Sequence, residues 1–391
     1  MRVAKLRPGT GWAAVSLKNR QIVLGISGSI AAFKAADLAS KLVQQGARVD
    51  VVMTREACEF VAPFSFRALT GRPVLTDMFH PQTDQPEEHI TLARHADLVI
   101  LAPASANTIA KLVHGFADDM VALTVLATKA PVLIAPAMDA QMWDAAATRA
   151  NVATLEQRGF TLVGPASGRL ASGYTGPGRL VEVETIIGAA KLVLARAGDL
   201  AGYSIAVSAG GTREPIGPVR YIGNRSSGKM GYALAEAARD RGASVTLVAT
   251  PTGLETPYGV ELRPVETVAE MRTAVLDATS TADALIMAAA VSDFRVATPG
   301  EQKLKKDESG GLTLSLVQNA DFLHEVPDRL VKVAFAAETE NLIENARRKP
   351  LSHGRLDLIC ANDVSAAGSG FGTDTNRVWI LDEAGGVEEL P

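Results

Sequence analysis

The sequence predicts an α/β protein with two doubly wound domains, each with helices on both faces of a parallel sheet. One observation is a buried-strand pattern at residues 21–27 that passes through small residues into a helix pattern. Another is that GARVDVVMT at 46–54 matches GASVTLVAT at 242–250 in Gly, Ala, Val, Val and Thr. A further echo pairs ADLVILAPASA at 96–106 with ADALIMAAAVS at 282–292. Repeated units of this kind indicate two Rossmann-like domains that bind ligands at the carboxyl ends of their strands.

Length and composition agree with this organisation. A chain of 391 residues is expected to form about two domains. It is 47% hydrophobic and 5% aromatic, with 34 glycines, which favours Ala- and Val-rich α/β domains over a disordered or fibrous chain. A helix pattern at 183–194 is followed by the turn-rich ARAGDLAGY, so the boundary is expected near residue 195. We therefore expect a flexible N-terminal arm at 1–19 and domains at 20–195 and 196–391.

Charge and cysteine content argue against several classes of partner. The net charge is −4 and there is no dense basic patch, so no nucleic-acid partner is expected. No segment has the roughly 18 apolar residues of a membrane helix, and the basic N-terminus lacks the apolar core of a signal peptide. The two cysteines, Cys58 and Cys360, are far apart and form no disulfide framework. The expected location is the cytoplasm.

A run rich in phosphate-binding groups lies at residues 220–231, RYIGNRSSGKMG, between a strand-like and a helix-like segment. The first N–H groups of a helix are unpaired, and the helix dipole adds partial positive charge there, so such a start attracts anions. The alternative is that the run serves only as a Ser- and Gly-rich turn. The phosphate-binding candidates are Ser226, Ser227, Gly228 and Lys229.

The first domain has a similar strand–turn–helix, GISGSIAAFK at 25–34. It resembles a phosphate cradle but has neither the GxGxxG spacing nor the Walker pattern. The hydroxyls of Ser27 and Ser29 are candidates to hold a ligand phosphate; the alternative is that one of them caps the helix. Other candidates at the same edge of the sheet are Gly28, Thr54, Ser105, Asn107 and Thr108.

Three more features of the first domain are candidates for a site. His89 lies beside acidic residues before a helix pattern, although a lone His is usually an ordinary structural residue. Asp139 follows a strand that ends in PAM, where the simplest interpretation is a helix N-cap. Residues 168–180, GRLASGYTGPGRL, are rich in glycine and indicate a mobile loop or lid.

Residues 20 to 385 resemble the bacterial bifunctional phosphopantothenoylcysteine decarboxylase/phosphopantothenate–cysteine ligases of coenzyme A biosynthesis. The motifs that carry the resemblance are GISGSIAAFK, His89, PASANT, PAMD and GPGR, then the long run at 209–231. The resemblance implies a flavodoxin-like first domain that binds FMN and a second domain that is the ligase. The substrates implied are 4′-phosphopantothenate, L-cysteine and CTP, with Mg²⁺. The FMN-binding positions implied are Ser27, Gly28, Ser29, Thr54, Ser105, Asn107 and Thr108.

Two departures from the family pattern concern the decarboxylase positions, which fall at His89, Asp139 and Ser172. The family has PAMN where this chain has Asp139, and an ionised Asp would repel the substrate carboxylate that an amide helps to hold. The family lid has ACG where this chain has Ala171-Ser172-Gly173. A Cys thiol has a pKa near 8.5, and a Ser hydroxyl is a far weaker acid. We therefore expect FMN binding with little or no complete decarboxylation.

The ligase positions match more closely. The resemblance implies that Arg220 and Asn224 help to form and use an acyl-nucleotide, and that Lys303 neutralises the triphosphate and the leaving pyrophosphate. The next family lysine after Lys349 falls at His353, with Arg355 nearby as a replacement. The nucleotide and phosphate positions implied are Ser226, Ser227, Gly228, Lys229, Asp293, Lys303, Ala320, Asp321, Phe322, Leu323, Phe335 and Lys349.

Two other functions remain open at this stage. One is a fully bifunctional enzyme that also makes 4′-phosphopantetheine; the other is a non-catalytic flavin-binding regulatory scaffold. The resemblance also implies a homo-oligomer with ligase dimers and flavin-domain trimers, which together would form a dodecamer.

Overall fold

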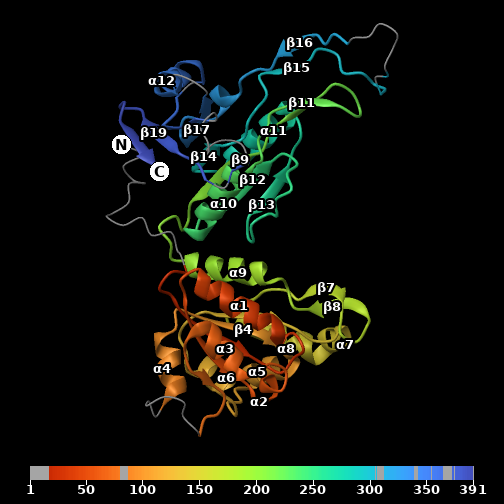
Figure 1. Cartoon of the computed structure of the whole chain (residues 1–391), viewed down its shortest axis with the longest axis vertical. Helices are drawn as coiled ribbons and strands as arrows, with labels where there is room; N and C mark the ends of the chain where they lie inside the picture. The colour runs from red at the N-terminus through yellow and green to blue at the C-terminus, as the bar shows by residue number, and fades with distance from the viewer. Residues whose placement is uncertain are drawn as a thin grey trace. The chain divides into compact units, whose positions relative to one another are not determined.

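The computed structural model has the predicted α/β class, with a mainly parallel sheet in each of two compact units (Figure 1). The first unit ends at Ala197 and the second starts at Gly198. Each unit is described by itself below. The residues that the structure describes are 17–79, 87–303, 305, 312–338, 342–353, 355–363, 372–373 and 375–390.

The first unit is built on a parallel sheet with the strand order β3-β2-β1-β4-β5-β6. Strand β3 has only two residues, and the other strands follow the order of a flavodoxin-like sheet. The direction of winding reverses between β1 and β4, and a ligand crevice is expected there at the carboxyl ends of the strands. The strands are β1 (Gln21–Ile26), β2 (Arg48–Met53), β3 (Val74–Leu75), β4 (Leu98–Ala104), β5 (Val132–Pro136) and β6 (Thr161–Leu162).

Helices follow the strands, and a hairpin of β7 (Ala166–Arg169) and β8 (Thr175–Arg179) forms the predicted lid segment. In α1 the buried residues Ala35, Leu38 and Leu42 recur at helical spacing, so one stripe faces the core. The helices are α1 (Ala32–Gln44), α2 (Arg55–Cys58), α3 (Pro63–Thr70), α4 (Glu88–His95), α5 (Ala106–His114), α6 (Met120–Ala127), α7 (Ala140–Asp144), α8 (Ala146–Gln157) and α9 (Val183–Ala195).

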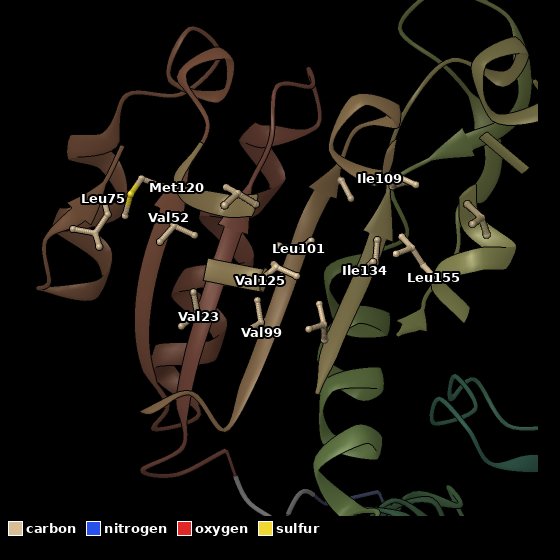
Figure 2. Close-up of a cluster of buried hydrophobic side chains, with 14 of the residues drawn as sticks. Val23, Val52, Leu75, Val99, Leu101, Ile109, Met120, Val125, Ile134 and Leu155 are labelled. Carbon is tan, nitrogen blue, oxygen red and sulfur yellow. The ribbon is translucent and has the colours of Figure 1, made fainter. Parts of the chain in front are cut away.

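The core of the first unit packs one face of the sheet against its helices (Figure 2). Val99 and Leu101 of β4 and Ile134 of β5 are at most 1% exposed. Met120 and Val125 of α6 belong to the same cluster. Burying each such side chain contributes about 1.5–3 kcal/mol, so this cluster fixes the strands whose ends carry the candidate site.

The start of the described chain packs onto the first unit. Leu17 is 1% exposed, and the Asn19 N–H donates a hydrogen bond to the Gly46 carbonyl at 2.8 Å. Residues 17–19, expected as the end of a flexible arm, are therefore held in place. The rest of that arm lies outside the described residues.

The second unit has the strand order β13-β12-β9-β14-β17-β18-β19-β20, with β19 and β20 antiparallel. Strand β12 contains the repeat of the β2 sequence, and β14 contains the repeat of the β4 sequence. The repeated strands occupy equivalent places, since β2 and β4 flank β1 and β12 and β14 flank β9. The strands are β9 (Ser204–Ala209), β12 (Ser244–Ala249), β13 (Glu261–Pro264), β14 (Ala284–Met287), β17 (Val331–Glu338), β18 (Leu358–Asp363), β19 (Val378–Asp382) and β20 (Val387–Leu390).

Helices and two short ribbons complete this unit. The ribbons, β10–β11 and β15–β16, extend beyond the end of the sheet (Figure 1). Every helix in the described ranges is too short or too polar to span a bilayer. These elements are β10 (Arg213–Pro215), β11 (Tyr221–Gly223), α10 (Lys229–Asp240), α11 (Val268–Thr279), β15 (Phe294–Val296), β16 (Leu316–Gln318), the 3₁₀ helix η2 (Leu323–Glu325) and α12 (Leu342–His353).

Candidate functional site

A cavity of about 1210 Å³ lies in the second unit, between the start of α10 and the segments that follow β14 and β16. This is the place where a doubly wound sheet is expected to bind its ligand, since β9 and β14 flank the reversal of winding. The volume exceeds that of an ordinary small-molecule site. The predicted residues that line it are Asn224, Ser226, Ser227, Gly228, Lys229, Asp293, Ala320, Asp321, Phe322, Leu323 and Phe335.

The start of α10 has the form of an anion site. Its N-cap is Gly228, which has a φ of +80° and makes no side-chain cap, and the residues of the first turn line the cavity. A Cβ at Gly228 would lie 2.8 Å from Thr252 Cγ2, and the positive φ also requires glycine. The Lys229 ammonium donates to the Gly372 carbonyl at 3.0 Å. The predicted run at 220–231 is therefore a built helix start and not only a turn.

Asn224 is attached to the segment that follows β14. Its Nδ2 donates to the Ala290 carbonyl at 3.1 Å, and the Thr212 N–H donates to the same carbonyl at 3.2 Å. The Thr212 hydroxyl accepts from the Ser292 N–H at 2.9 Å. These bonds connect the Gly-rich turn after β9 with residues 288–293, so Asn224 and Asp293 line the same cavity.

The structure adds Asn362 to the cavity, a residue that sequence reasoning missed. Asn362 of β18 pairs in register with Ala337 of β17, so its side chain shares a face with Ala337 and with Phe335 two residues earlier. It is 9% exposed and lines the cavity. No hydrogen bond to its amide is found in the part of the chain that the structure describes. The available signal was a polar residue inside the apolar strand run LICAND.

Phe322 has a double role. It is 3% exposed and packs in a core cluster with Met271 and Val275, although it also lines the cavity wall. Asp321 beside it accepts a hydrogen bond from the Leu323 N–H at 3.0 Å, which shapes the start of η2.

Arg220 and Lys303 lie together but outside this cavity. They line a small separate hollow with residues 216–219, the turn between β10 and β11. The Ile216 N–H donates to the Arg220 carbonyl at 2.8 Å, and the Gly300 N–H donates to the Ile216 carbonyl at 2.9 Å. Both predicted side chains are therefore carried by the ribbons and not by the sheet.

The last cationic candidates are placed only in part. Lys349 and His353 belong to α12, but their side chains fall outside the described residues. Arg355 is described: its guanidinium pairs with Asp357 at 3.0 Å and with Glu383 at 3.6 Å. Arg355 is therefore already held by carboxylates of its own unit.

In the first unit, Ser27 joins the ends of β1 and β4. Its buried hydroxyl donates to the Pro103 carbonyl at 2.8 Å and accepts from the Ser105 N–H at 2.8 Å. The alternative that Ser27 or Ser29 caps the helix is not found, because α1 has Ala31 as its N-cap with no side-chain bond. Ser29 instead accepts a local bond from the Ala31 N–H at 3.3 Å.

The neighbouring polar candidates follow β2 and β4, the strands on either side of β1, and two of them cap the helices that follow. Thr54 accepts from the Ala57 N–H at 3.2 Å and caps α2. Ser105 accepts from the Thr108 N–H at 3.2 Å and caps α5. Asn107, beside them in the first turn of α5, is exposed. Gly28 is close-packed, since a Cβ there would lie 2.6 Å from Glu56 Cβ.

Asp139 and Ser172 are in direct contact. The Ser172 hydroxyl donates to Asp139 Oδ2 at 2.7 Å, and the Gln141 N–H donates to Oδ1 at 3.0 Å, so Asp139 also caps α7 as expected. The bond from Ser172, followed by the bond from Gln141, lowers the pKa of Asp139. Asp139 is therefore ionised at neutral pH.

A backbone hydrogen bond joins the lid hairpin to Met138, the residue before Asp139. The Met138 N–H donates to the Gly178 carbonyl at 2.9 Å. A Cβ at Gly178 would lie 2.3 Å from the Met138 carbonyl oxygen. Half-buried His89 lies in the first turn of α4, and no hydrogen bond in the described residues joins it to Asp139 or Ser172. The structure thus brings two of the three decarboxylase candidates together.

Comparisons with known proteins match both units. The Flavoprotein family model matches residues 13–194, and the model of the DNA/pantothenate metabolism flavoprotein C-terminal domain matches residues 200–391. The coenzyme A biosynthesis bifunctional protein CoaBC of Bacillus subtilis is 48% identical over 381 residues, which cover 96% of this chain and 93% of that protein. The chain belongs to the coenzyme A biosynthesis bifunctional protein family. The resemblance found in the sequence is thereby confirmed.

Other members of this bifunctional family are similarly close. The Escherichia coli K12 protein is 45% identical over 377 residues, covering 95% of this chain and 93% of that protein. The Mycobacterium bovis protein is 44% identical over 384 residues, covering 94% and 91%. Among solved structures, a CoaBC C-terminal domain is 37% identical with a TM-score of 0.41, covering 49% of this chain and 87% of that one. The FMN-dependent cysteine decarboxylase SpaF is 31% identical with a TM-score of 0.39, covering 44% and 95%.

Proposed function

We propose that the second unit joins 4′-phosphopantothenate to L-cysteine at the expense of CTP, and that the first unit binds FMN but performs little or no complete decarboxylation. The observation that carries the ligase proposal is the cavity, in which a phosphate-binding helix start and the Asn224 amide line the same space as Phe335 and Asn362. Membership of the bifunctional family supports the pairing of a flavoprotein unit with a ligase unit.

The arrangement fits a nucleoside triphosphate. The first turn of α10 and Lys229 provide N–H groups and positive charge for phosphates. Phe335 offers an aromatic side chain on the same sheet face as Asn362, so the base would lie against the ring while the amide bonds to its edge. An amide can accept from the cytosine amino group and donate to the ring nitrogen. Phosphates and base would then occupy opposite parts of one cavity.

The reaction has two balanced steps. First, a carboxylate oxygen of 4′-phosphopantothenate attacks the α-phosphorus of CTP, and pyrophosphate leaves with the electron pair of the broken P–O bond. Next, the amine of L-cysteine attacks the acyl carbon, the amide forms, and CMP leaves while the amine loses a proton. Negative charge develops in both steps, and preorganised donors such as the Asn224 amide stabilise it. Water must be kept from the acyl-nucleotide, which a walled cavity favours.

The remaining ligase candidates keep their proposed roles. Asp293 lies at the cavity, whereas Arg220 and Lys303 line the separate hollow at the β10–β11 turn and would supply positive charge to the triphosphate. Within the described residues, His, Cys, Asp and Glu side chains form no group of three or more that could hold a metal ion. Mg²⁺ would therefore be held mainly by the triphosphate oxygens, as is usual for this ion.

The first unit fits a flavin phosphate at the ends of β1 and β4. Ser27 and Ser105 are hydrogen-bonded there, Ser29 lies in the turn that follows β1, and the turn at Gly28 has no space for a side chain beside Glu56. Bound FMN would supply the redox capacity that decarboxylation of a cysteine needs. In this chain the neighbouring Asp139 is ionised and would repel a substrate carboxylate. The Ser172 hydroxyl donates a hydrogen bond to Asp139 and is too weak an acid to replace a thiol.

We further propose a cytoplasmic homo-oligomer with ligase dimers and flavin-domain trimers, up to a dodecamer. Light scattering on the full chain would measure its mass, and a monomeric species would overturn this part.

Asn224→Asp tests the ligase proposal. The substitution replaces an amide donor with a carboxylate, so CMP release should fall by about a hundredfold or more while the flavin absorbance stays intact. The control is Asn151→Asp, which makes the same change in the first unit. Asn319→Asp would not serve as a control, because Asn319 also lines the cavity. A variant at Asn224 with wild-type CMP release would reject the proposed site. Cysteine-dependent CMP release by the wild-type chain separates the ligase from a non-catalytic flavin-binding scaffold.

A further inference from the structure

Arg239 is a fully buried cation near the proposed nucleotide site. Its side chain is 1% exposed, although arginine is rarely buried unless it is paired. Its Nε donates to Asp240 Oδ1 at 2.8 Å, and its Nη2 donates to Glu236 Oε1 at 3.1 Å. The two carboxylates satisfy the charge of the guanidinium. One further nitrogen, Nη1, is then available for a neutral acceptor.

That acceptor belongs to a different segment. Nη1 donates to the carbonyl oxygen of Tyr258 at 2.7 Å. Tyr258 is the last residue of the segment 250–258, which follows β12 and leads toward β13. The bond therefore fastens the far end of this segment to α10. A bond from a charged donor to a carbonyl is among the stronger hydrogen bonds in a protein.

The N-terminal end of the same segment packs on Gly210 and Gly228, the second of which is the N-cap of α10. A Cβ at Gly228 would lie 2.8 Å from Thr252 Cγ2, and a Cβ at Gly210 would lie 2.1 Å from Thr250 Oγ1. These distances show that the segment lies so close to both glycines that no side chain would fit there. Any shift of the segment would change the contacts of Gly228, the N-cap of α10.

The middle of the segment forms a wall of the cavity. Leu254, Glu255 and Pro257 line it, and so does Glu236, the residue that Arg239 holds from the α10 side. Arg239 thus connects both parts of this wall, one on the helix and one on the segment. It lies behind the wall and is itself absent from the residues that line the cavity.

We propose that Arg239 is a positioning residue for nucleotide binding, which acts by clamping segment 250–258 against α10. This inference rests on the proposed function, because it deepens the assignment of the cavity to CTP. Arg239 does not touch the reacting atoms. Its effect passes through the contacts of Thr252 with Gly228 and through the wall residues. A loosened wall would weaken CTP binding and leave the chemical steps nearly unchanged.

Arg239→Lys in the full chain is the test. A lysine ammonium is a compact charge and cannot reproduce the fork of Arg239, so it cannot hold both Asp240 and the Tyr258 carbonyl. The matched control is Arg241→Lys at the end of the same helix. Arg241 makes a comparable fork to Asp199, with distances of 3.0 and 2.6 Å, but does not line the cavity. Both variants lose one forked ion pair of α10.

The expected result is a rise of about tenfold in KM for CTP in Arg239→Lys, with kcat and the KM for L-cysteine within about twofold of wild type. Arg241→Lys should lower the melting temperature without changing the KM for CTP. Equal kinetic behaviour of the two variants would overturn the inference, as would a loss of kcat with an unchanged KM.

Thr252→Ser keeps the test valid if Arg239→Lys does not fold. It leaves Arg239 in place and removes only the methyl group that packs on Gly228, so the KM for CTP should rise by a smaller factor. An unchanged KM in this variant would overturn the inference. A wild-type chain that releases no CMP would reject the proposed function itself, whereas CMP release with no effect of these substitutions would reject only the role of Arg239.

Discussion

The hydroxyl of Ser172 donates a 2.7 Å hydrogen bond to the carboxylate of Asp139, so the two residues that depart from the family pattern are partners in this chain. One lies on the lid hairpin and the other caps α7. Their contact replaces an amide and a thiol with an ion and an alcohol. The pair accounts for why we expect FMN binding without efficient decarboxylation.

Restoring both family residues should raise the decarboxylase activity that we expect to be low. Asp139→Asn with Ser172→Cys removes the repelling charge and supplies an acidic thiol, so release of 4′-phosphopantetheine should rise by about tenfold or more over wild type. Each single variant should release less 4′-phosphopantetheine than the double variant, because it changes only one of the two residues. Product mass spectrometry measures the gain.

Ser167→Cys is the matched control for this experiment. Ser167 lies on β7 of the same hairpin, so the control adds a thiol to the lid at a different position. No gain from the double variant, in protein that folds and retains flavin, would contradict the account.

The lowered pKa of Asp139 can be measured directly. Its first cause is the bond from Ser172, so Ser172→Ala should raise this pKa toward the ordinary value for Asp. A pKa lowered by folding contributes stability above the unfolded value, and this contribution is lost as the pH falls through the folded value. NMR titration of labelled carboxyl groups would follow the shift. Asp199, whose pKa is lowered chiefly by Arg241, should titrate as before.

Asn362→Leu should weaken binding of the nucleotide. The substitution keeps a similar side-chain size and removes the amide, so the KM for CTP should rise by about tenfold, equivalent to roughly 1.4 kcal/mol. The KM for 4′-phosphopantothenate should change little. Steady-state kinetics with each substrate varied in turn would show this. The opposite pattern, a raised KM for 4′-phosphopantothenate alone, would place the amide at the other substrate.

Ser27→Ala should destabilise the first unit. It removes the acceptor of the Ser105 N–H and one of the two donors to the Pro103 carbonyl, which keeps the Ser27 N–H at 3.1 Å, at a cost of about 1–3 kcal/mol. Denaturant unfolding measures the cost, and FMN retention should fall as well. Ser29→Ala is the control, since it loses only a local 3.3 Å bond. Equal stability of the two variants would show that the buried bridge is unimportant.

Local sequence was enough to predict the helix start at residues 226–229, because a helix start with Gly228 at its N-cap depends on adjacent residues. It was also enough for the cap at Asp139. Asn362 was missed because its place in the cavity depends on the register of β17 with β18, which joins residues 25 positions apart. Arg239 was missed because its sequence context is an ordinary helical charge pattern. Its link to segment 250–258 is visible only in the hydrogen bond to the Tyr258 carbonyl.

Contacts between distant segments also explain why Arg220 and Lys303 lie outside the cavity. Both were grouped with Asn224 by resemblance, but the β10–β11 turn carries one and the segment before β16 carries the other. The path of such ribbons is set by contacts between distant segments, which a motif does not encode.

The most direct test of the central claim is mass-spectrometric analysis of all products when the FMN-loaded full chain receives CTP, Mg²⁺, 4′-phosphopantothenate and L-cysteine. The account predicts equal amounts of CMP, pyrophosphate and phosphopantothenoylcysteine, with little 4′-phosphopantetheine. Conversion of most of the phosphopantothenoylcysteine to 4′-phosphopantetheine and carbon dioxide would contradict it and establish a fully bifunctional enzyme.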